Sequence, residues 1–133
     1  MIVEVEENRV GTTVINAAIE VHRVLGNGLL ESVYEKALAH ELTDRGLRVA
    51  LQVPVEVQYK GHPLELGFRA DMLVEDLVLL ELKSVETVTL AHRKQVQTYL
   101  NLTGYRLGYL LNFGAALLKH GIIRCVNKLP ETS

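Results

Sequence analysis

The sequence has little of what marks a disulfide scaffold, a zinc protein or a membrane protein. Cys125 is its one cysteine, which excludes an internal disulfide and favours a reducing compartment. One cysteine and five scattered histidines make no zinc-binding pattern. The longest apolar runs, such as residues 77–80 and 109–111, are far too short to cross a bilayer. These absences predict a soluble protein that does not have a membrane as its partner.

An excess of positive charge is also missing. The formal net charge is −2, which counts against tight nonspecific binding of nucleic acid but leaves room for a local basic rim. Residues 1–7 are acidic and lack the basic start and apolar core of a signal peptide, so we expect a cytoplasmic location. There is no Gly-x-x-x-x-Gly-Lys loop, and Gly26-Asn27-Gly28 is typical of a turn rather than of a phosphate-binding loop.

No linker or internal repeat divides the chain, and we expect residues 1–133 to form a single domain. Hydrophobic periodicity predicts helices over residues 13–25, capped by Thr12 or Thr13, over 31–45 and over 90–102. Strands are predicted over 48–59, 64–74, 77–83 and 106–112, with a further one over 122–126. The predicted core faces of the first two helices are Val14, Ala18, Val21 and Leu25, then Val33, Tyr34, Ala37, Leu38 and Leu42. The order α-α-β-β-β-α-β predicts an α/β fold, with an antiparallel meander and a crossover helix building a mixed sheet.

The most informative segment is the apolar hairpin over residues 69–83, which carries Asp71, Glu81 and Lys83 near its ends. A charge within an apolar strand costs several kcal/mol unless it is paired or holds a metal. Side chains alternate between the two faces of a strand, so Asp71 meets Glu81 only if the strands pair about Asp76. This requires an odd turn such as Glu75-Asp76-Leu77, because a two-residue turn would put the two acids on opposite faces.

If the register holds, two carboxylates approach each other across the hairpin and repel unless a cation lies between them. Oxygen ligands suit Mg²⁺ or Mn²⁺, and the backbone carbonyl of Leu82 could supply a further ligand. Lys83 could then steady the attacking hydroxide or the charge that grows on a phosphate. The alternative is that Glu81 and Lys83 are solvated residues of a half-exposed strand, since Glu-x-Lys is common by chance.

Asp71 followed by Glu81-Leu82-Lys83 resembles the signature of the PD-(D/E)XK nuclease superfamily, although Ala70 stands where that signature usually has proline. Residues 28–34, Gly-Leu-Leu-Glu-Ser-Val-Tyr, are similar to the pattern of the GxxExxY family, which is assigned to this superfamily. The flanking segments 19–26 and 95–104 also resemble that family, so the likeness covers about residues 15–126.

The resemblance implies a restriction-endonuclease-like α-β-β-β-α-β core, here with an extra N-terminal helix. It implies that Asp71 and Glu81 bind metal, that Lys83 is catalytic, and that Glu31 is the additional acid seen in many such nucleases. Gln95 and Tyr99 resemble a Gln-x-x-x-Tyr element that lies beside the metal site and helps to hold the substrate. Helical spacing supports this part independently, since Gln95 and Tyr99 are four residues apart and share a face.

Several other polar residues have both a functional and a structural interpretation. Glu31, early in its helix, could simply favour the helix dipole, and Glu35 is expected at the surface. His92 lies three residues before Gln95 and is a candidate for substrate contact, whereas His22 is expected to be a hydrogen-bonded core residue. Basic side chains that could contact phosphates or could be plain surface charge are Arg69, Arg93 and Lys94.

The sequence thus favours a nuclease that depends on Mg²⁺ or Mn²⁺ and acts on nucleic acid, most simply DNA. The alternative is a weakly active or inactive module on the same scaffold that binds nucleic acid or protein. So short a chain has little extra surface for gripping DNA, which leaves a homodimer or a partner protein open.

Overall fold

The order of helices and strands agrees with the sequence prediction. The structure is a computed structural model that describes residues 5–131, without the side chains of residues 65–67. Its elements are α1 (Glu6–Leu25), α2 (Glu31–Asp44), β1 (Val49–Tyr59), β2 (His62–Val74), β3 (Val78–Lys83), α3 (Leu90–Thr103), β4 (Leu107–Asn112), the 3₁₀ helix η1 (Leu118–Gly121) and β5 (Ile122–Val126). No helix in the described part is long and apolar enough to cross a membrane.

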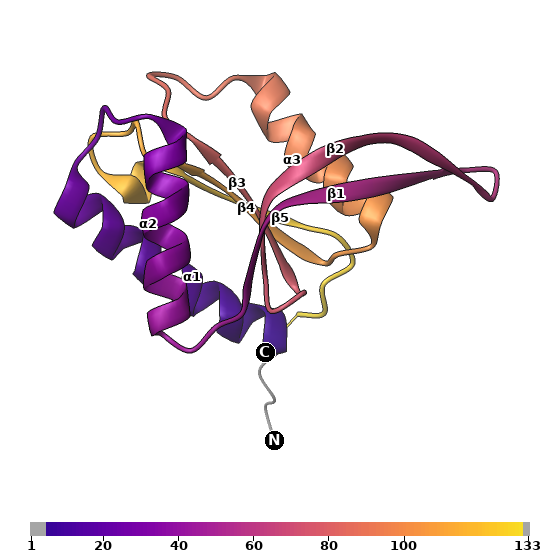
Figure 1. The fold of residues 1–133 in the computed structure, drawn as a ribbon, viewed down its shortest axis with the longest axis horizontal. Helices are drawn as coiled ribbons and strands as arrows, with labels where there is room; N and C mark the ends of the chain where they lie inside the picture. The colour runs from indigo at the N-terminus through magenta and orange to yellow at the C-terminus, as the bar shows by residue number, and fades with distance from the viewer. Residues whose placement is uncertain (1–4, 132–133) are drawn as a thin grey trace.

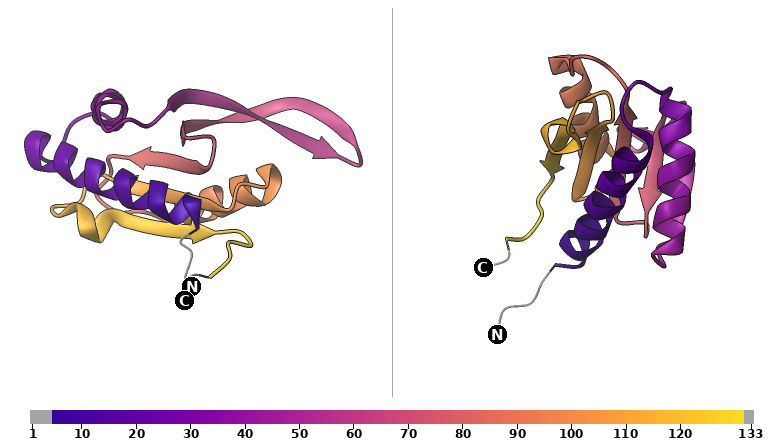
Figure 2. Two further views of the ribbon diagram at one scale, coloured as in Figure 1. Left: turned by 90° about the horizontal axis from the view of Figure 1, so that it is seen from below. Right: turned by 90° about the vertical axis from the view of Figure 1, so that its left-hand side faces the viewer.

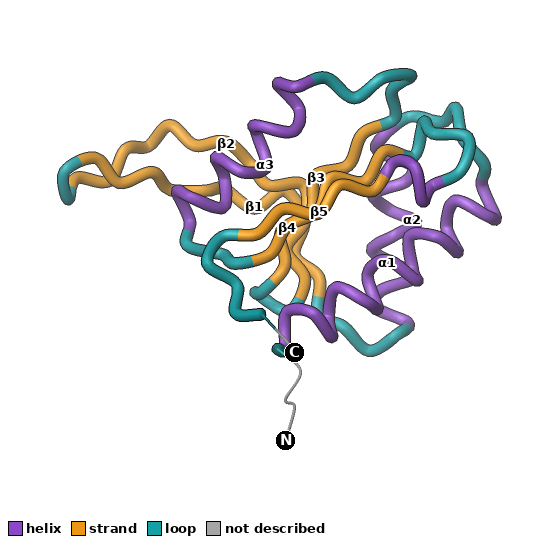
Figure 3. Tube along the Cα trace, turned by 180° about the vertical axis from the view of Figure 1, so that it is seen from behind, coloured by secondary structure: helices purple, strands orange, loops and turns teal. Residues whose placement is uncertain are grey.

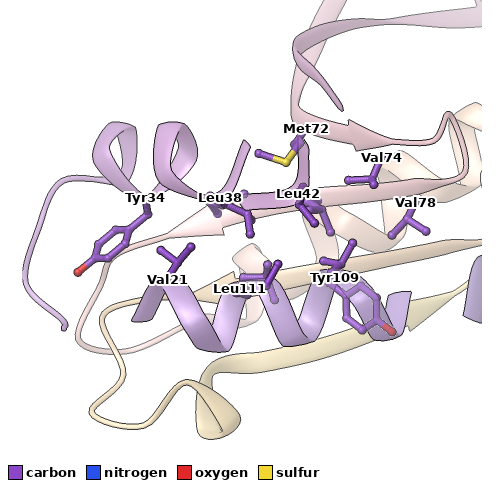
Figure 4. Close-up of a cluster of buried hydrophobic side chains, with 14 of the residues drawn as sticks. Val21, Tyr34, Leu38, Leu42, Met72, Val74, Val78, Tyr109 and Leu111 are labelled. Atoms are coloured by element: carbon purple, nitrogen blue, oxygen red, sulfur yellow. The ribbon is translucent and has the colours of Figure 1, made fainter. Parts of the chain in front are cut away.

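The strands form one mixed sheet in the order β1-β2-β3-β4-β5 (Figure 1). All neighbours are antiparallel except β3 and β4, which run parallel because α3 crosses over between them. Alternate side chains of β3 face opposite layers: Leu80 packs with α1 and α2, and Leu79 packs with α3. Figure 4 shows part of the hydrophobic core that the sheet forms with α1 and α2. The predicted restriction-endonuclease-like fold, with its extra N-terminal helix, is confirmed.

The sheet divides where β2 leaves β3. Their pairing runs from Val74 opposite Val78 only as far as Met72 opposite Leu80. The β1–β2 pairing continues beyond that point, to Tyr59 opposite His62. Residues 53–70 therefore form a two-stranded ribbon, called the arm below, that extends away from the sheet (Figures 1 and 2). The place where the arm and β3 separate is called the fork, and Figure 3 shows it from behind.

Two predicted boundaries were wrong. Helix α1 begins at Glu6 with Val5 as its N-cap, not near residue 13 behind Thr12 or Thr13. Its first turn is held by tertiary contacts, because the buried Glu7 carboxylate accepts two hydrogen bonds from Arg106, the shorter at 2.6 Å. The turn before β2 contains only Lys60 and Gly61, both at positive φ as a two-residue hairpin turn requires, so residues 62 and 63 belong to the strand.

Two residues expected in the core are instead substantially exposed. Leu25 is 37% exposed and Val33 is 40% exposed. Both lie near the loop that joins α1 to α2. The apolar spacing of the helices extends to these two side chains, but no further element in the described part of the chain covers them. Of the other residues predicted for the core face of α2, Tyr34, Leu38 and Leu42 are fully buried and Ala37 is partly buried.

Candidate metal and nuclease site at the fork

The turn between β2 and β3 has the odd length that the site requires. Glu75, Asp76 and Leu77 separate Val74 from its partner Val78. Glu75 and Asp76 both adopt positive φ, at 54° and 51°. The pairing is therefore centred on Asp76, and continuing it past the last ladder pair places Asp71 opposite Glu81 at the fork. The predicted register is confirmed.

Both carboxylates accept hydrogen bonds from backbone amides. The Asp71 amide donates to Oε1 of Glu81 at 3.3 Å, and the Leu82 amide donates to Oδ2 of Asp71 at 2.8 Å. Within a β ladder, backbone amides donate to backbone carbonyls of the neighbouring strand. The Asp71 and Leu82 amides lie just beyond the last β2–β3 ladder pair, and there the two carboxylates act as acceptors in place of those carbonyls. The separation of the strands thus makes room for two acids and also fixes their orientation.

Ionisation of both carboxylates at the fork is unfavourable without a cation. Glu81 is only 3% exposed. Burial, together with the negative charge of Asp71, raises the pKa of Glu81 to about 8, although the Lys83 charge acts in the opposite direction. A divalent cation between the two carboxylates would stabilise both in their ionised forms.

The donor set suits a hard cation. Among the described side chains, no group of three or more His, Cys, Asp or Glu residues is placed to share one metal ion. Mg²⁺ does not need such a group, because it is commonly held by one or two carboxylates together with water and substrate phosphates. The Leu82 amide points toward Asp71 in the fork, and the carbonyl of a strand residue points to the same side as its amide. Asp71, Glu81 and the Leu82 carbonyl therefore fit such an ion.

Lys83 lies two residues after Glu81 on the same strand and so shares its face. Its backbone is well anchored, since the Lys83 carbonyl accepts a 2.8 Å hydrogen bond from the Phe113 amide. The buried Asn112 opposite Lys83 holds the loop that follows β3. Its side-chain amide accepts from the Val85 N–H at 3.1 Å and donates to the Val85 carbonyl at 3.0 Å.

Helix α3, which carries Gln95 and Tyr99, packs on the face of β3 to which Glu81 belongs. The Gln95 side-chain amide donates to the Tyr99 hydroxyl at 2.6 Å. Tyr99 is 7% exposed. Burial raises the pKa of Tyr99, the hydrogen bond from Gln95 lowers it, and the charges of Glu81 and Asp71 raise it further. Gln95 and Tyr99 thus lie together on one face of α3, as their helical spacing predicts.

His92 and Arg69 occupy positions that the sequence alone does not reveal. His92 completes a capping box at the start of α3, where its Nδ1 accepts from the Thr89 amide at 3.1 Å. This local bond explains a histidine there without any substrate. Arg69 is exposed on the arm, and its guanidinium donates to the carbonyl of Gln52 at 3.4 Å.

The acid of α2 that is linked to the fork is Glu35 rather than Glu31. Glu31 is exposed at the first residue of the helix. One turn later, Oε1 of Glu35 accepts from the Gln52 side-chain amide at 3.0 Å, and the same amide donates to Oδ1 of Asp71 at 3.4 Å. Glu35 shares a helix face with Glu31, which could have indicated it. No local signal marks Gln52, whose φ of 50° is unusual for a strand residue.

His22 makes the hydrogen bond expected of it but is only partly buried. Its Nε2 lies 2.8 Å from the Ala115 carbonyl, and its ring stacks on Phe113. The hydroxyl of Tyr34 similarly ties the loop between α1 and α2, donating to the Gly26 carbonyl at 2.6 Å and accepting from the Leu29 amide. Tyr34 is therefore a structural residue of that loop.

The mixed sheet, the helices on its two faces and the acids at the fork define a nuclease-type α/β domain. A comparison with protein families matches residues 8–125 to the PD-(D/E)XK nuclease superfamily, and the chain belongs to this superfamily. Membership indicates a nuclease-type function on a nucleic acid substrate, and nucleases of this superfamily generally use divalent metal ions. No curated protein and no solved structure matches the chain.

Proposed function

We propose that this protein is a Mg²⁺- or Mn²⁺-dependent nuclease of the GxxExxY family that hydrolyses DNA in the cytoplasm, and that residues 1–133 form one nuclease domain. The observation that supports this most directly is the pair of carboxylates at the fork, Asp71 and Glu81, with Lys83 on the same face. Superfamily membership supports the reaction class, and the donor set supports the choice of cation.

In this proposal Asp71, Glu81 and the Leu82 carbonyl hold the metal. A bound divalent cation supplies positive charge for the phosphate oxygens and makes water a better nucleophile. The protein contributes orientation, because each carboxylate is already held by a backbone amide of the opposite strand. Pre-organised ligands do not need to be reordered when the substrate arrives.

Lys83 is proposed as the catalytic residue that supplies a positive charge from the protein, in addition to that of the metal ion. Its ammonium donates to the attacking water or to a non-bridging phosphate oxygen and stabilises the charge that develops there. Water attacks in line, a new bond from oxygen to phosphorus forms, and the bond to the leaving nucleotide oxygen breaks. Lys83 is only partly buried in β3 and lies on the same strand face as the buried Glu81.

The remaining proposed roles concern substrate and a further acid. Gln95 and Tyr99 orient the nucleic acid strand beside the carboxylates. Arg69 contacts a phosphate from the arm, and His92 is a further candidate at the start of α3. The resemblance proposes Glu31 as an additional acid. The contact through Gln52 supports Glu35 for that role instead.

The test compares cleavage by wild type, Lys83→Ala and a control, Lys119→Ala, which removes an exposed lysine on η1. Supercoiled, linear and single-stranded DNA, together with RNA, are incubated with Mn²⁺, and Mn²⁺ binding is measured separately by calorimetry. We expect wild type and Lys119→Ala to cleave, and Lys83→Ala to bind Mn²⁺ but to lose at least about a hundredfold in rate.

Retained cleavage by Lys83→Ala would overturn the assignment of Lys83. Absence of both cleavage and Mn²⁺ binding in wild type would overturn the nuclease proposal. It would favour the binding module that the sequence leaves open, acting alone, as a homodimer or with a partner protein.

A further inference from the structure

The arm carries a cavity next to the fork. Residues 54–56, 63–64 and 68–69 line a space of about 650 Å³. Its walls combine apolar side chains, from Pro54, Val55, Leu64 and Phe68, with polar surface, and among the described side chains its charged groups are Arg69 and Glu56. A two-stranded ribbon is only marginally stable by itself. This one is supported because Val55 and Phe68 pack against the core beneath α3.

A stacked aromatic pair joins this cavity to helix α3. The rings of Phe68 and Tyr99 are parallel within 3°, with their centroids 3.6 Å apart. Tyr99 is almost fully buried. Phe68 is only partly buried and borders the cavity. One face of the Phe68 ring is thus covered by Tyr99, and the ring itself forms part of the cavity wall.

The charged groups of the cavity suit a phosphate at its rim. Arg69 is exposed, and among the described residues its guanidinium has a single long hydrogen bond, to the Gln52 carbonyl at 3.4 Å. The negative Glu56 is already engaged by the Gln58 amide at 2.9 Å. Gln52 links this rim to the proposed metal ligand, because its backbone carbonyl accepts from Arg69 and its side-chain amide donates to Asp71.

From these contacts we infer that the arm cavity binds an unpaired nucleobase, which stacks on Phe68 while Arg69 holds a neighbouring phosphate. Base stacking on an aromatic ring needs a free face of the base, and in a duplex both faces are covered by neighbouring bases. The substrate class is therefore single-stranded nucleic acid, or a single-stranded segment next to a duplex. This inference rests on the proposed function, because the ligand of the cavity is the nucleic acid substrate of that function.

The chain contains no tryptophan, which allows a direct optical test. Phe68→Trp places one indole in the cavity wall, and Tyr59→Trp places one on the same arm outside the cavity, where the tyrosine is 58% exposed. Both are made in the Lys83→Ala background with Mn²⁺, so that the probe stays intact. The probes are a labelled DNA strand of about 12 nucleotides and the duplex formed from it.

We expect the single strand to quench the fluorescence of Phe68→Trp and to leave that of Tyr59→Trp nearly unchanged, and the duplex to quench neither. Fluorescence anisotropy of the labelled strand should show weaker binding by Phe68→Leu, by about fivefold or more, because leucine keeps the apolar contact with Tyr99 but has no aromatic face. Thermal unfolding of Phe68→Leu close to that of wild type would confirm that the arm remains folded.

Single-strand binding by anisotropy without quenching of Phe68→Trp would overturn the inference, and so would equal weakening of single-strand and duplex binding by Phe68→Leu. Sedimentation showing that Phe68→Leu dissociates a dimer would also overturn it, because the cavity would then be an interface between copies. If the single strand quenches Phe68→Trp but wild type neither cleaves nucleic acid nor binds Mn²⁺, the nucleobase site is supported and the proposed nuclease activity is overturned.

Discussion

The backbone amide of Asp71 donates a hydrogen bond to Oε1 of Glu81 across the fork, at 3.3 Å. The reciprocal bond runs from the Leu82 amide to Asp71 at 2.8 Å. Two strand ends that no longer pair through their backbones are thus joined through their acids. Because the amides hold the carboxylates in place, the position of the acids depends on the register of β2 and β3 and not on a bound ligand.

The pKa of Glu81 predicts a pH dependence of stability in the metal-free protein. An unfolded glutamate releases its proton near pH 4.5, whereas the folded protein holds it to about pH 8 because of burial and Asp71. Between these values the folded state binds more protons, so the free energy of unfolding falls as pH rises, by up to about 5 kcal/mol over the window. Urea unfolding in EDTA at several pH values measures this change.

Glu81→Gln should remove most of that slope and should be more stable than wild type near pH 8. Glu86→Gln, an exposed change after β3, is the matched control and should keep the slope. Parallel stability curves for wild type and Glu81→Gln would contradict the assignment of the slope to Glu81.

Gln52 should act as a positioning residue for Asp71. Its side-chain amide bridges Asp71 and Glu35, and its backbone adopts a φ of 50° that costs a non-glycine residue roughly 1 kcal/mol. Gln52→Gly should therefore leave stability unchanged or slightly higher, while Mn²⁺ affinity measured by calorimetry falls about tenfold. Gln58→Gly, on the same strand, is the control for backbone effects, and a similar loss of affinity there would contradict the role of Gln52.

The two acids of α2 can be separated by substitution. Glu35→Gln should lower the Mn²⁺-dependent cleavage rate about tenfold or more, because Glu35 is linked to Asp71 through Gln52. Glu31→Gln, which changes an exposed residue one turn earlier, should have a smaller effect. Initial rates at saturating Mn²⁺ provide the comparison, and the opposite ranking would assign the additional acid to Glu31.

Asn112 should stabilise the loop after Lys83. Its amide group donates to the Val85 carbonyl at 3.0 Å and is only 4% exposed. Asn112→Asp keeps the shape but replaces that donor with a charged acceptor, so the free energy of unfolding at pH 7 should fall by about 2 kcal/mol. Urea unfolding measures the loss, and Asn16→Asp, an exposed position on α1, should change it far less. Equal effects would contradict a specific role for the buried amide.

Several features followed from local sequence alone. The hydrophobic periods indicated every α-helix and strand but not the short helix η1, because a period of two or of about 3.6 residues reflects which face of a longer element is buried. The sequence made the facing of Asp71 and Glu81 conditional on an odd turn, and the observed turn of three residues meets that condition.

The tertiary structure decided the rest, because it depends on contacts between residues far apart in the chain. Helix α1 starts at Glu6 because Arg106 lies against that turn, and Leu25 and Val33 are exposed because no element covers them. The link from Glu35 through Gln52 to Asp71 joins a helix and two strands at one point. The fork itself arises where β2 stops pairing with β3, and no pattern within either strand encodes that separation.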